Sequence, residues 1–489
     1  MINPRRMDGM RTFFLAGLCV LNFTLAAWSQ ERFRKSPPIP DPLQELKLPL
    51  IESATLSNGL TLAVARKSSS PLLSLQLVVL AGEIDSRPDL PGAASLTANM
   101  IGRGTDLLSA GEIEERIESF GGEFAASVSL DVTVFTFNVL EENLDKALEI
   151  FSMIVLKASF PEGQMDTVKR TAYYELFEKE KDPEYVAKRQ LYRMLFKGHP
   201  YQTSIFNEDV IKNVGRQDIV AFYDHFYRPN NALLVISGNM NLSTASRKIS
   251  HYFNTWTARR IDRSLLPSPP PNDKDQVAFI DLPQAKDTTI FLGNVIFPAT
   301  SSDYFPFIVL NQVLGGTMGS RLFMNLRESK GYASYAFSGA DFFKSCGVFW
   351  IRAKVTPEVI RDSVQEILKE IGPAAVEGIS SFEIEQAKSF LIGNFPLKNE
   401  PLTSFSLEVA RIKAFNLGED HWNKYYENII LVNLESVLAT AQRIFQPRPV
   451  VVIVGNKNLV ADYLREFDKV DIYDISGNLR STINKGVEK

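Results

Sequence analysis

The chain has 489 residues, more than one ordinary hydrophobic core accommodates, so we expect at least two domains. Hydrophobic residues make up 45% of it and charged residues 22%, which is typical of a globular protein and excludes a low-complexity chain. The 53 basic and 57 acidic side chains nearly balance, at a net charge of −4, so nothing in the charge indicates a nucleic-acid partner.

The N-terminus has the pattern of a secretory signal peptide. Basic residues up to Arg11 precede the apolar run Thr12–Trp28, and Ala27 and Ser29 place small residues before a cleavage site. We therefore predict a signal peptide over residues 1–29. The alternative is a retained N-terminal anchor. No later segment of the sequence is long and apolar enough to span a bilayer.

The chain has two cysteines. Cys19 lies in the predicted signal peptide, which leaves Cys346 alone after cleavage. An intrachain disulfide and a cysteine-based zinc site are therefore excluded. Export with a single cysteine predicts a location in the bacterial periplasm rather than a disulfide-rich extracellular module.

The body of the chain repeats one order of elements. A helix ends at Tyr227, and a proline, an apolar strand and a Gly-Asn turn follow it up to Asn239. Residues 445–456 repeat that order. Earlier in each half, an apolar strand (73–80 and 288–295) leads to a helix that ends in a glycine turn. The pattern predicts an internal duplication of about two hundred residues.

The predicted fold class is α+β, with two homologous domains that are each a mostly antiparallel sheet packed with helices. We place the first domain at 51–265 and the second at 277–480, joined by a proline-rich linker at 266–276. Residues 30–50 are predicted to be a linker or arm, and residues 481–489 a tail.

Several short motifs together carry a family resemblance. In this order and spacing, over about residues 50–475, the chain resembles the insulinase/pitrilysin-like zinc peptidases, which include mitochondrial processing peptidase. The resemblance implies that the two domains form half of a clamshell chamber. The motifs are Asn58-Gly59-Leu60, Gly92–Met100, Gly104-Thr105, Phe120-Gly121-Gly122, His199-Pro200-Tyr201, Leu314–Phe323 and Arg327–Tyr332.

The zinc helix of that family carries the inverted motif His-x-x-Glu-His, which supplies two metal ligands and a general base. By resemblance these positions fall on Ser95, Ala98 and Asn99, so no catalytic residue is intact. The family's third ligand falls on Glu175, which is either a relic of that site or part of a solvated helical face. No two of the four histidines form an i, i+4 pair, so we expect no metal in this chain. The histidines are His199, His225, His251 and His421.

The second half of the family supplies an arginine and a tyrosine that bind substrate. The arginine corresponds to Arg327, and the tyrosine position falls on Ser334, between Tyr332 and Tyr335. A β-bulge that shifts the strand by one residue would bring Tyr335 to that position. Alternatively, the two tyrosines pack on a sheet and Arg327 forms a salt bridge.

An edge strand for peptide binding is predicted in the first half. The alternating stretch 123–140 indicates two antiparallel strands. By resemblance, the first of them, with Glu123 and Phe124, is the edge that an extended substrate joins by β-augmentation.

These observations predict a non-catalytic subunit of a heterodimeric insulinase-family zinc metallopeptidase. It would close the chamber and bind extended peptide, while the zinc lies in a homologous partner subunit that has the intact motif. We expect no metallopeptidase activity from this chain alone. The alternative is a scaffold or peptide-binding pseudopeptidase without a proteolytic partner. A third reading, an autonomous metallopeptidase, is disfavoured by the missing ligands.

Overall fold

The computed structural model describes residues 49–485, apart from 68–69, 205–207, 264, 273 and 419–420. The predicted signal peptide at 1–29 lies outside the described residues, as does the arm at 30–50 except for its last two residues. Within the described part of the chain, no helix is long and apolar enough to cross a membrane.

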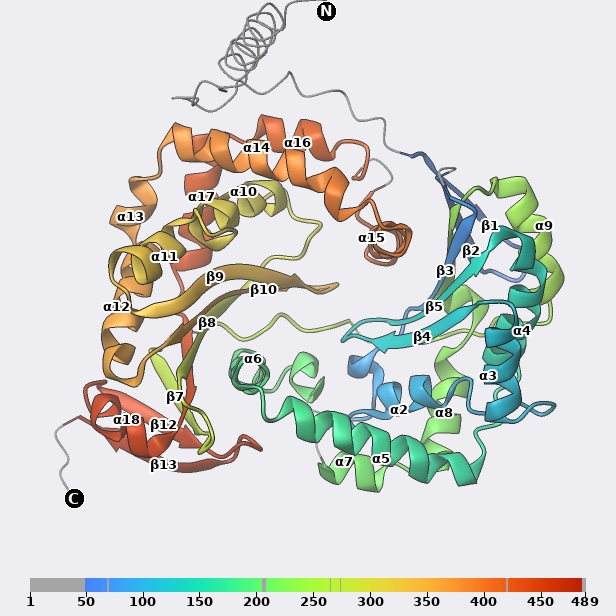
Figure 1. The fold of residues 1–489 in the computed structure, drawn as a ribbon, viewed down its shortest axis with the longest axis horizontal. Helices are drawn as coiled ribbons and strands as arrows, with labels where there is room; N and C mark the ends of the chain where they lie inside the picture. The colour runs from blue at the N-terminus through green and yellow to red at the C-terminus, as the bar shows by residue number, and fades with distance from the viewer. Residues whose placement is uncertain are drawn as a thin grey trace, which may run out of the picture. The chain divides into compact units, whose positions relative to one another are not determined.

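The first sheet, counted over the described residues, has six strands in the order β1-β2-β6-β3-β5-β4 (Figure 1). β2 and β6 run parallel, and the other neighbours are antiparallel. The two strands predicted within 123–140 are confirmed as β4 and β5, and β4 is an edge strand. The strands are β1 (Ile51–Thr55), β2 (Thr61–Arg66), β3 (Leu72–Val79), β4 (Glu123–Val128), β5 (Thr133–Leu140) and β6 (Ala232–Gly238).

The second sheet has seven strands in the described region, in the order β13-β12-β7-β11-β8-β10-β9. β7 runs parallel to β11 and β12, and the other pairs are antiparallel. The predicted domain end at residue 480 falls inside β13, so residues 481–484 belong to the sheet. The strands are β7 (Gln276–Asp281), β8 (Thr288–Ile296), β9 (Ala333–Phe342), β10 (Gly347–Val355), β11 (Val450–Gly455), β12 (Lys469–Tyr473) and β13 (Leu479–Asn484).

Helices pack on these sheets in both halves. Those of the first half are α2 (Ala93–Met100), α3 (Ala110–Ser119), α4 (Leu144–Leu156), α5 (Glu162–Lys179), α6 (Pro183–Leu195), α7 (Glu208–Asn213), α8 (Arg216–Phe226) and α9 (Leu242–Phe253). Those of the second half are α10 (Tyr304–Gly315), α11 (Arg321–Phe323), α12 (Ile360–Glu370), α13 (Pro373–Glu377), α14 (Ser381–Lys398), α15 (Leu402–Ala414), α16 (Tyr425–Leu431), α17 (Leu434–Phe445) and α18 (Lys457–Leu464).

The two halves repeat one plan, which confirms the predicted duplication and fold class. Each half has an 18-residue helix followed by a 13-residue helix: α5 and α6, then α14 and α15. In α5 the Nζ of Lys169 donates to the carbonyl oxygen of Lys212 at 3.0 Å. In α14 the Nζ of Lys388, at the same position of its helix, donates to the carbonyl oxygen of Val432 at 3.1 Å.

A polar motif sets the start of α14. The backbone N–H of Ser380 donates to the carboxylate of Glu383 at 2.9 Å, and the Ser380 hydroxyl accepts from the Glu383 N–H at 3.3 Å. This is the capping-box arrangement, which satisfies N–H groups that a helix leaves free at its first turn. Arg321 also donates to Glu383, with Nη2 at 2.8 Å from the carboxylate.

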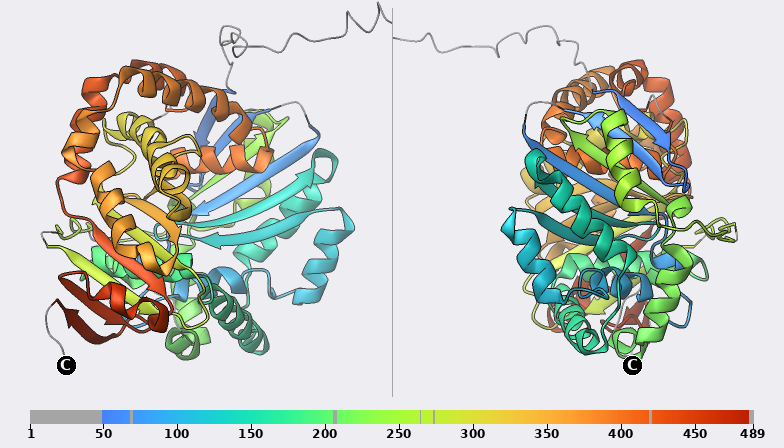
Figure 2. Two further views of the ribbon diagram at one scale, coloured as in Figure 1. Left: turned by 60° about the vertical axis from the view of Figure 1, so that its left-hand side comes forward. Right: turned by 90° about the vertical axis from the view of Figure 1, so that its right-hand side faces the viewer.

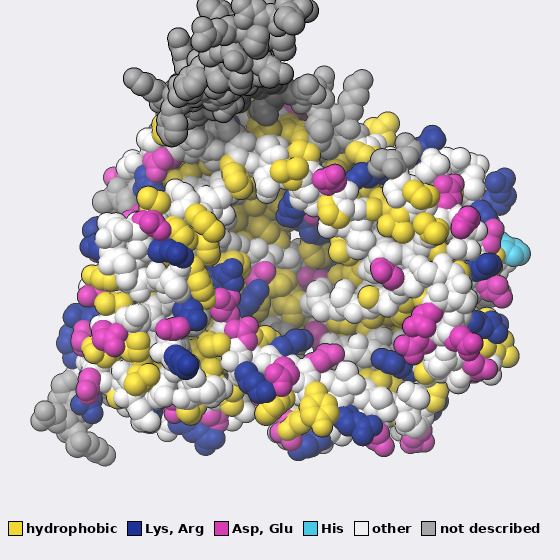
Figure 3. Space-filling view, in the orientation of Figure 1, with side chains coloured by type: hydrophobic (Ala, Val, Ile, Leu, Met, Phe, Trp, Pro, Cys, Tyr) yellow, Lys and Arg dark blue, Asp and Glu magenta, His cyan; other side chains and the backbone are white. Residues whose placement is uncertain are grey.

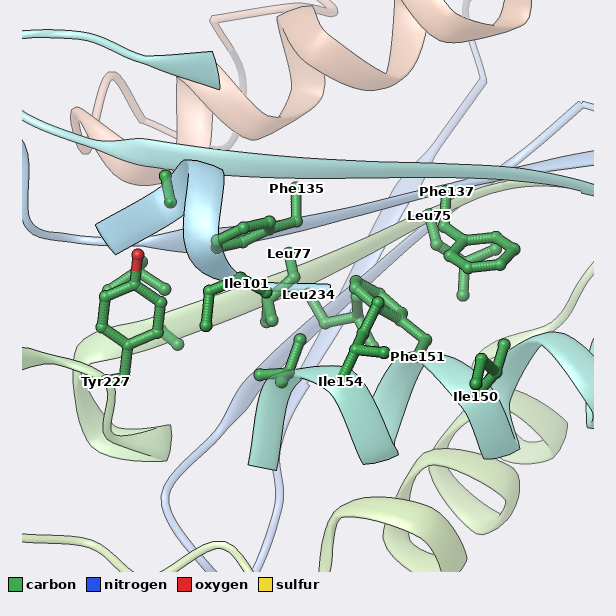
Figure 4. Close-up of a cluster of buried hydrophobic side chains, with 14 of the residues drawn as sticks. Leu75, Leu77, Ile101, Phe135, Phe137, Ile150, Phe151, Ile154, Tyr227 and Leu234 are labelled. Carbon is green, nitrogen blue, oxygen red and sulfur yellow. The ribbon is translucent and has the colours of Figure 1, made fainter. Parts of the chain in front are cut away.

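The core of the first half lies between the first sheet and α4 (Figure 4). Alternate residues of β5 point to the same face, so Phe135 and Phe137 both turn toward Phe151 of α4. The ring centroids of Phe137 and Phe151 are 5.4 Å apart. Each such ring contributes about 1.5–3 kcal/mol by leaving water.

One helix of the first half packs on the sheet of the second. α6 turns its apolar residues Val186, Leu191 and Leu195 into a buried cluster with Phe291 and Val348 of the second sheet. Figures 1 and 2 show α6 beside β8. The helix starts cleanly because Asp182 accepts from the N–H of Glu184 at 3.0 Å and Pro183 occupies the first helical position.

A helix of the second half likewise packs on the sheet of the first half. α15 buries Phe405 and Val409 against Ala63, Val78 and Val235 of the first sheet. The two exchanged helices are the equivalent members of the duplicated helix pairs. Each sheet therefore has one face covered by its own half and the other partly covered by a helix of the opposite half.

Candidate functional site

The helix α2 carries the three degenerate zinc positions, and a buried carboxylate holds its first turn. The backbone N–H groups of Gly92 and Ser95 donate to the Glu83 carboxylate at 3.0 and 3.1 Å. The Ser95 hydroxyl donates to the same carboxylate. The Glu83 carboxyl group thus accepts hydrogen bonds from N–H groups at the N-terminal end of α2 that have no partner within the helix.

The environment of Glu83 is close to that of a core residue. Burial raises the pKa of this carboxyl, and hydrogen bonds from Ser95, Gly92 and Ser86 oppose that rise. Sequence reasoning missed Glu83, because its contact with Ser95 spans twelve residues across a loop and follows no local motif.

Ala98 and Asn99 lie beside the edge strand. Ala98 is buried and Asn99 is exposed, and both line a cavity of about 340 Å³ between α2, α3 and β4. Phe124 and Ala125 of β4 line the same cavity. Of the predicted peptide-binding side chains, Glu123 is exposed and accepts from Asn138 Nδ2 at 3.4 Å.

Phe124 points largely inward. Its ring stacks on Phe135 with centroids 6.0 Å apart and meets the edge of Phe151 at 6.1 Å. Phe124 therefore offers a bound peptide mainly its backbone groups and one side of its ring.

Glu175 lies on the exposed face of α5, a helix that packs on α2. Among the described residues, no three His, Cys, Asp or Glu side chains are grouped as metal ligands would be. His199 is buried elsewhere, with Nε2 at 2.9 Å from the carbonyl oxygen of Pro267. A hydroxyl bonded to Glu83, a methyl group and an amide do not form a zinc donor set, so α2 does not fit the metal that its family position implies.

Arg327 lies in a π-helical turn, Met324–Ser329, and is exposed. Its Nη1 donates to the carbonyl oxygen of Ser334, and its Nε lies 3.5 Å from Glu328. A β-bulge lies at this point: Tyr335 pairs with Lys354, and Ser334 has no partner in the strand register.

Tyr335 forms a hydrogen bond with a residue of the first half. Its hydroxyl donates to Glu184 at the start of α6, and Arg352 Nη1 binds the same carboxylate. Burial and this carboxylate raise the pKa of Tyr335. Tyr332, Tyr335 and Arg327 lie outside the lining of the central cavity described next.

A central cavity of about 1020 Å³ lies between the halves, at the upper end of the range for ligand sites. Figure 3 shows this hollow, with hydrophobic side chains around it. Glu83 and Ser95 line it from the first half, together with Val128 and Ser129 where β4 ends. The cavity therefore joins the degenerate zinc helix to the end of the edge strand.

The charges of the cavity are mostly paired. Lys188 Nζ lies 2.7 Å from Asp341, and Arg411 Nη2 lies 2.6 Å from Glu408. Burial opposes ionisation of Glu408, but its bonds to Arg411 and the nearby Lys398 lower its pKa overall.

The fold and this site define a class: a chain of two duplicated peptidase-type domains whose first domain has a zinc helix without zinc ligands. Two family descriptions match it, "Insulinase (Peptidase family M16)" over residues 61–209 and "Peptidase M16 inactive domain" over residues 213–391. The chain belongs to the insulinase family of peptidases, M16.

Curated relatives are similar in sequence to most of the chain. An "Uncharacterized zinc protease" of Rickettsia bellii is 26% identical over 409 residues, which cover 83% of this chain and 97% of the relative. "Zinc protease PqqE" of Helicobacter pylori is 26% identical over 348 residues, which cover 70% of this chain and 77% of the relative.

Solved structures share the fold. A protease from Helicobacter pylori superposes with a TM-score of 0.76 at 22% identity, over 83% of this chain and all of that one (100%). The periplasmic protease PqqL from Escherichia coli superposes with a TM-score of 0.69 at 16% identity, and this chain covers 48% of it.

Proposed function

We propose that this chain is the non-catalytic subunit of a heterodimeric M16 zinc peptidase. The observation that carries the proposal is α2, the zinc helix of a family member with Ser95, Ala98 and Asn99 in the ligand and base positions. Hydrolysis in such a complex depends on a homologous partner subunit with an intact His-x-x-Glu-His motif, which holds the zinc. This chain closes the chamber.

Its second role in the proposal is to bind extended peptide. No described strand pairs with the outer edge of β4, and this edge lies beside the small cavity next to α2. Backbone groups of such an edge pair with an incoming strand largely without regard to its sequence. Exposed Arg327 is available to a substrate carbonyl, whereas Tyr335 must first leave Glu184.

We place the mature protein in the periplasm. The support is the signal-like sequence at 1–29, and the fold neighbour PqqL of Escherichia coli is a periplasmic protease.

The test is co-expression of the full chain with a homologue that has the intact motif. We expect the two to co-purify, and the pair to hydrolyse an unstructured peptide faster than the homologue alone. As a control, Glu→Gln in the homologue's motif should abolish hydrolysis and leave the association intact. No association, or full activity of the homologue alone, overturns the proposal.

Peptide binding along β4 has its own test. Alternate N–H groups of an extended peptide point to opposite sides, so N-methylation of one alternate set removes the donors for β4 and methylation of the other set does not. We expect the two isomers to differ at least about tenfold in Kd, the cost of a few lost hydrogen bonds. Equal affinities would exclude β-augmentation.

The alternative is a peptide-binding scaffold without a proteolytic partner. The observation that favours it is that residues of this chain alone form both the β4 edge and the central cavity. Peptide binding by the chain together with no association to an intact homologue would select this function.

A further inference from the structure

Two helices of the second half build a distinct side of the central cavity. We define the α10–α14 wall as Ile308, Asn311 and Gln312 of α10 with Phe390, Leu391 and Asn394 of α14. On each helix these positions are one, three or four residues apart and therefore share one face. The opposite face of α10 packs Phe307, Leu310 and Leu314 into the core of the second half.

The polar groups of the wall are neutral amides with unused hydrogen-bonding capacity. Oδ1 of Asn311 accepts from the Ser338 hydroxyl at 2.8 Å. The side-chain amides of Gln312 and Asn394 have no hydrogen-bond partner among the described residues. An amide offers both a donor and an acceptor, which are the two groups that each residue of a peptide backbone presents.

The six residues of the wall are themselves uncharged. Of the charged side chains that line the cavity nearby, Lys188 is paired with Asp341 and Arg411 with Glu408, and Lys398 lies one turn beyond Asn394 near Glu408. The stretch of α14 from Ser389 to Leu397 has no charged side chain. Phe390 is 44% exposed there, and an exposed aromatic ring on an uncharged cavity wall is typical of a binding surface.

The middle of α14 is also poorly optimised as a helix. Gly393 lies in its interior, and a Cβ there would meet nothing within 4 Å, so packing does not demand glycine. Pro396 has no N–H, which leaves the carbonyl oxygen of Ile392 without its helical donor. Gly393 and Pro396 are not among the residues that line the central cavity, so they weaken the helix that carries the wall without forming part of it.

We propose that the α10–α14 wall is a second peptide subsite, which holds an uncharged, apolar segment of an extended peptide. The proposal deepens the proposed function and rests on it. Val128 and Ser129 at the end of β4 line the same cavity, so a peptide that leaves β4 enters it. Gln312 and Asn394 bond to the peptide backbone, and Phe390 packs on its side chains.

The test measures binding of two fluorescein-labelled, uncharged peptides to the full chain by anisotropy. One has about 14 residues, on the order of 45 Å when extended, and the other is its half that spans β4 alone. In the double variant Gln312→Glu/Asn394→Asp, we expect the long peptide to bind at least about tenfold more weakly and the short one to be unaffected, because a carboxylate cannot donate to the peptide's carbonyl groups and loses hydration when an uncharged peptide covers it. The matched control, Gln217→Glu/Asn254→Asp, changes the same chemistry at exposed first-half positions and should behave as wild type.

A cross-link provides a second readout that leaves the amides intact. A benzophenone amino acid in place of Phe390 should capture the long peptide, and the same substitution at the exposed Tyr174 of α5 should not. Equal binding of the long peptide by the double variant and its control, without capture at Phe390, overturns the wall subsite.

The pattern of results separates the two proposals. If the double variant binds the long peptide more weakly but the two N-methylated isomers bind equally, pairing with β4 is overturned and the wall subsite stands. If the two N-methylated isomers bind differently but the double variant binds as its control does, the wall subsite is overturned and pairing with β4 stands. No binding of either peptide by wild type overturns both.

Discussion

α5 and α14 are equivalent helices whose surfaces have diverged. Both have 18 residues and both are followed by an exchanged 13-residue helix. Glu175 and Asn394 hold the same position in them, thirteen residues after the first. Around Glu175 the exposed face is charged, whereas around Asn394 it is uncharged from Ser389 to Leu397 and borders the central cavity. The two halves have thus kept the lengths and order of these helices, while the side chains on the exposed faces of α5 and α14 have changed.

The first-half frame should still accept a metal. Ser95→His, Ala98→Glu and Asn99→His together restore the family motif on α2, with Glu175 as third protein ligand. We expect bound zinc to rise from a trace to about one per chain, because three such ligands hold zinc tightly. Elemental analysis measures this, and Glu175→Gln in the same background should lower it. A triple variant without bound zinc would show that α2 and Glu175 no longer lie where they can share one metal.

The exchanged helices should contribute equally to stability. Leu191→Ala in α6 is expected to cost about 2–5 kcal/mol and Phe405→Ala in α15 about 3–5 kcal/mol, because both side chains are fully buried and leave cavities. Urea denaturation measures the cost. Leu368→Ala, at a half-exposed site, is the control and should cost less than about 1 kcal/mol. A negligible cost at one of the two buried sites would contradict a reciprocal exchange.

Acid should weaken the start of α14. Bonds from Arg321 and Ser380 lower the pKa of Glu383 from 4.5 to about 2. A carboxyl whose pKa is lowered by folding stabilises the protein above its unfolded pKa, so this contribution is present above pH 4.5 and is lost as the pH falls toward about 2. We expect the thermal midpoint to fall more steeply in this window for wild type than for Glu383→Gln. At the equivalent position α5 has the uncharged Gln164.

Gly393→Ala should raise the stability of the chain by a small amount without changing peptide binding. Since a Cβ at this site has open space, alanine is expected to stabilise the free chain by about 0.4–1 kcal/mol. Gly393 does not line the central cavity, so binding of the long uncharged peptide should be unchanged. Gly163→Ala on α5, where space is also open, is the control for stability and should leave binding unchanged. A stabilised variant that binds the long peptide more weakly than wild type would contradict the position of Gly393 outside the wall.

Local and repeated patterns could be predicted from the sequence. The alternation in 123–140 predicted β4 and β5, and a one-residue offset in the family resemblance identified the segment where a bulge would shift Tyr335. The repeated order of helix, proline, strand and Gly-Asn turn predicted the duplication. Each of these signals lies within one element or recurs in two, so it needs no knowledge of tertiary contacts.

Long-range contacts could not be predicted. Nothing local to Ser95 indicates that Glu83 satisfies its helix, and nothing in the α6 sequence states that its apolar stripe packs on the opposite sheet. An amphipathic pattern shows that a helix has a buried face but not which partner covers it. The bond of Tyr335 to Glu184 escaped prediction for the same reason, since it joins residues 151 positions apart.

The helix exchange has a consequence for the order of synthesis. The first sheet is complete in sequence at Gly238, but α15, which covers the face bearing Ala63, Val78 and Val235, begins at Leu402. At typical translation rates of roughly 5–20 residues per second, this apolar face waits on the order of ten to thirty seconds for its cover. The nascent first half therefore needs protection from aggregation until its sister half has been made.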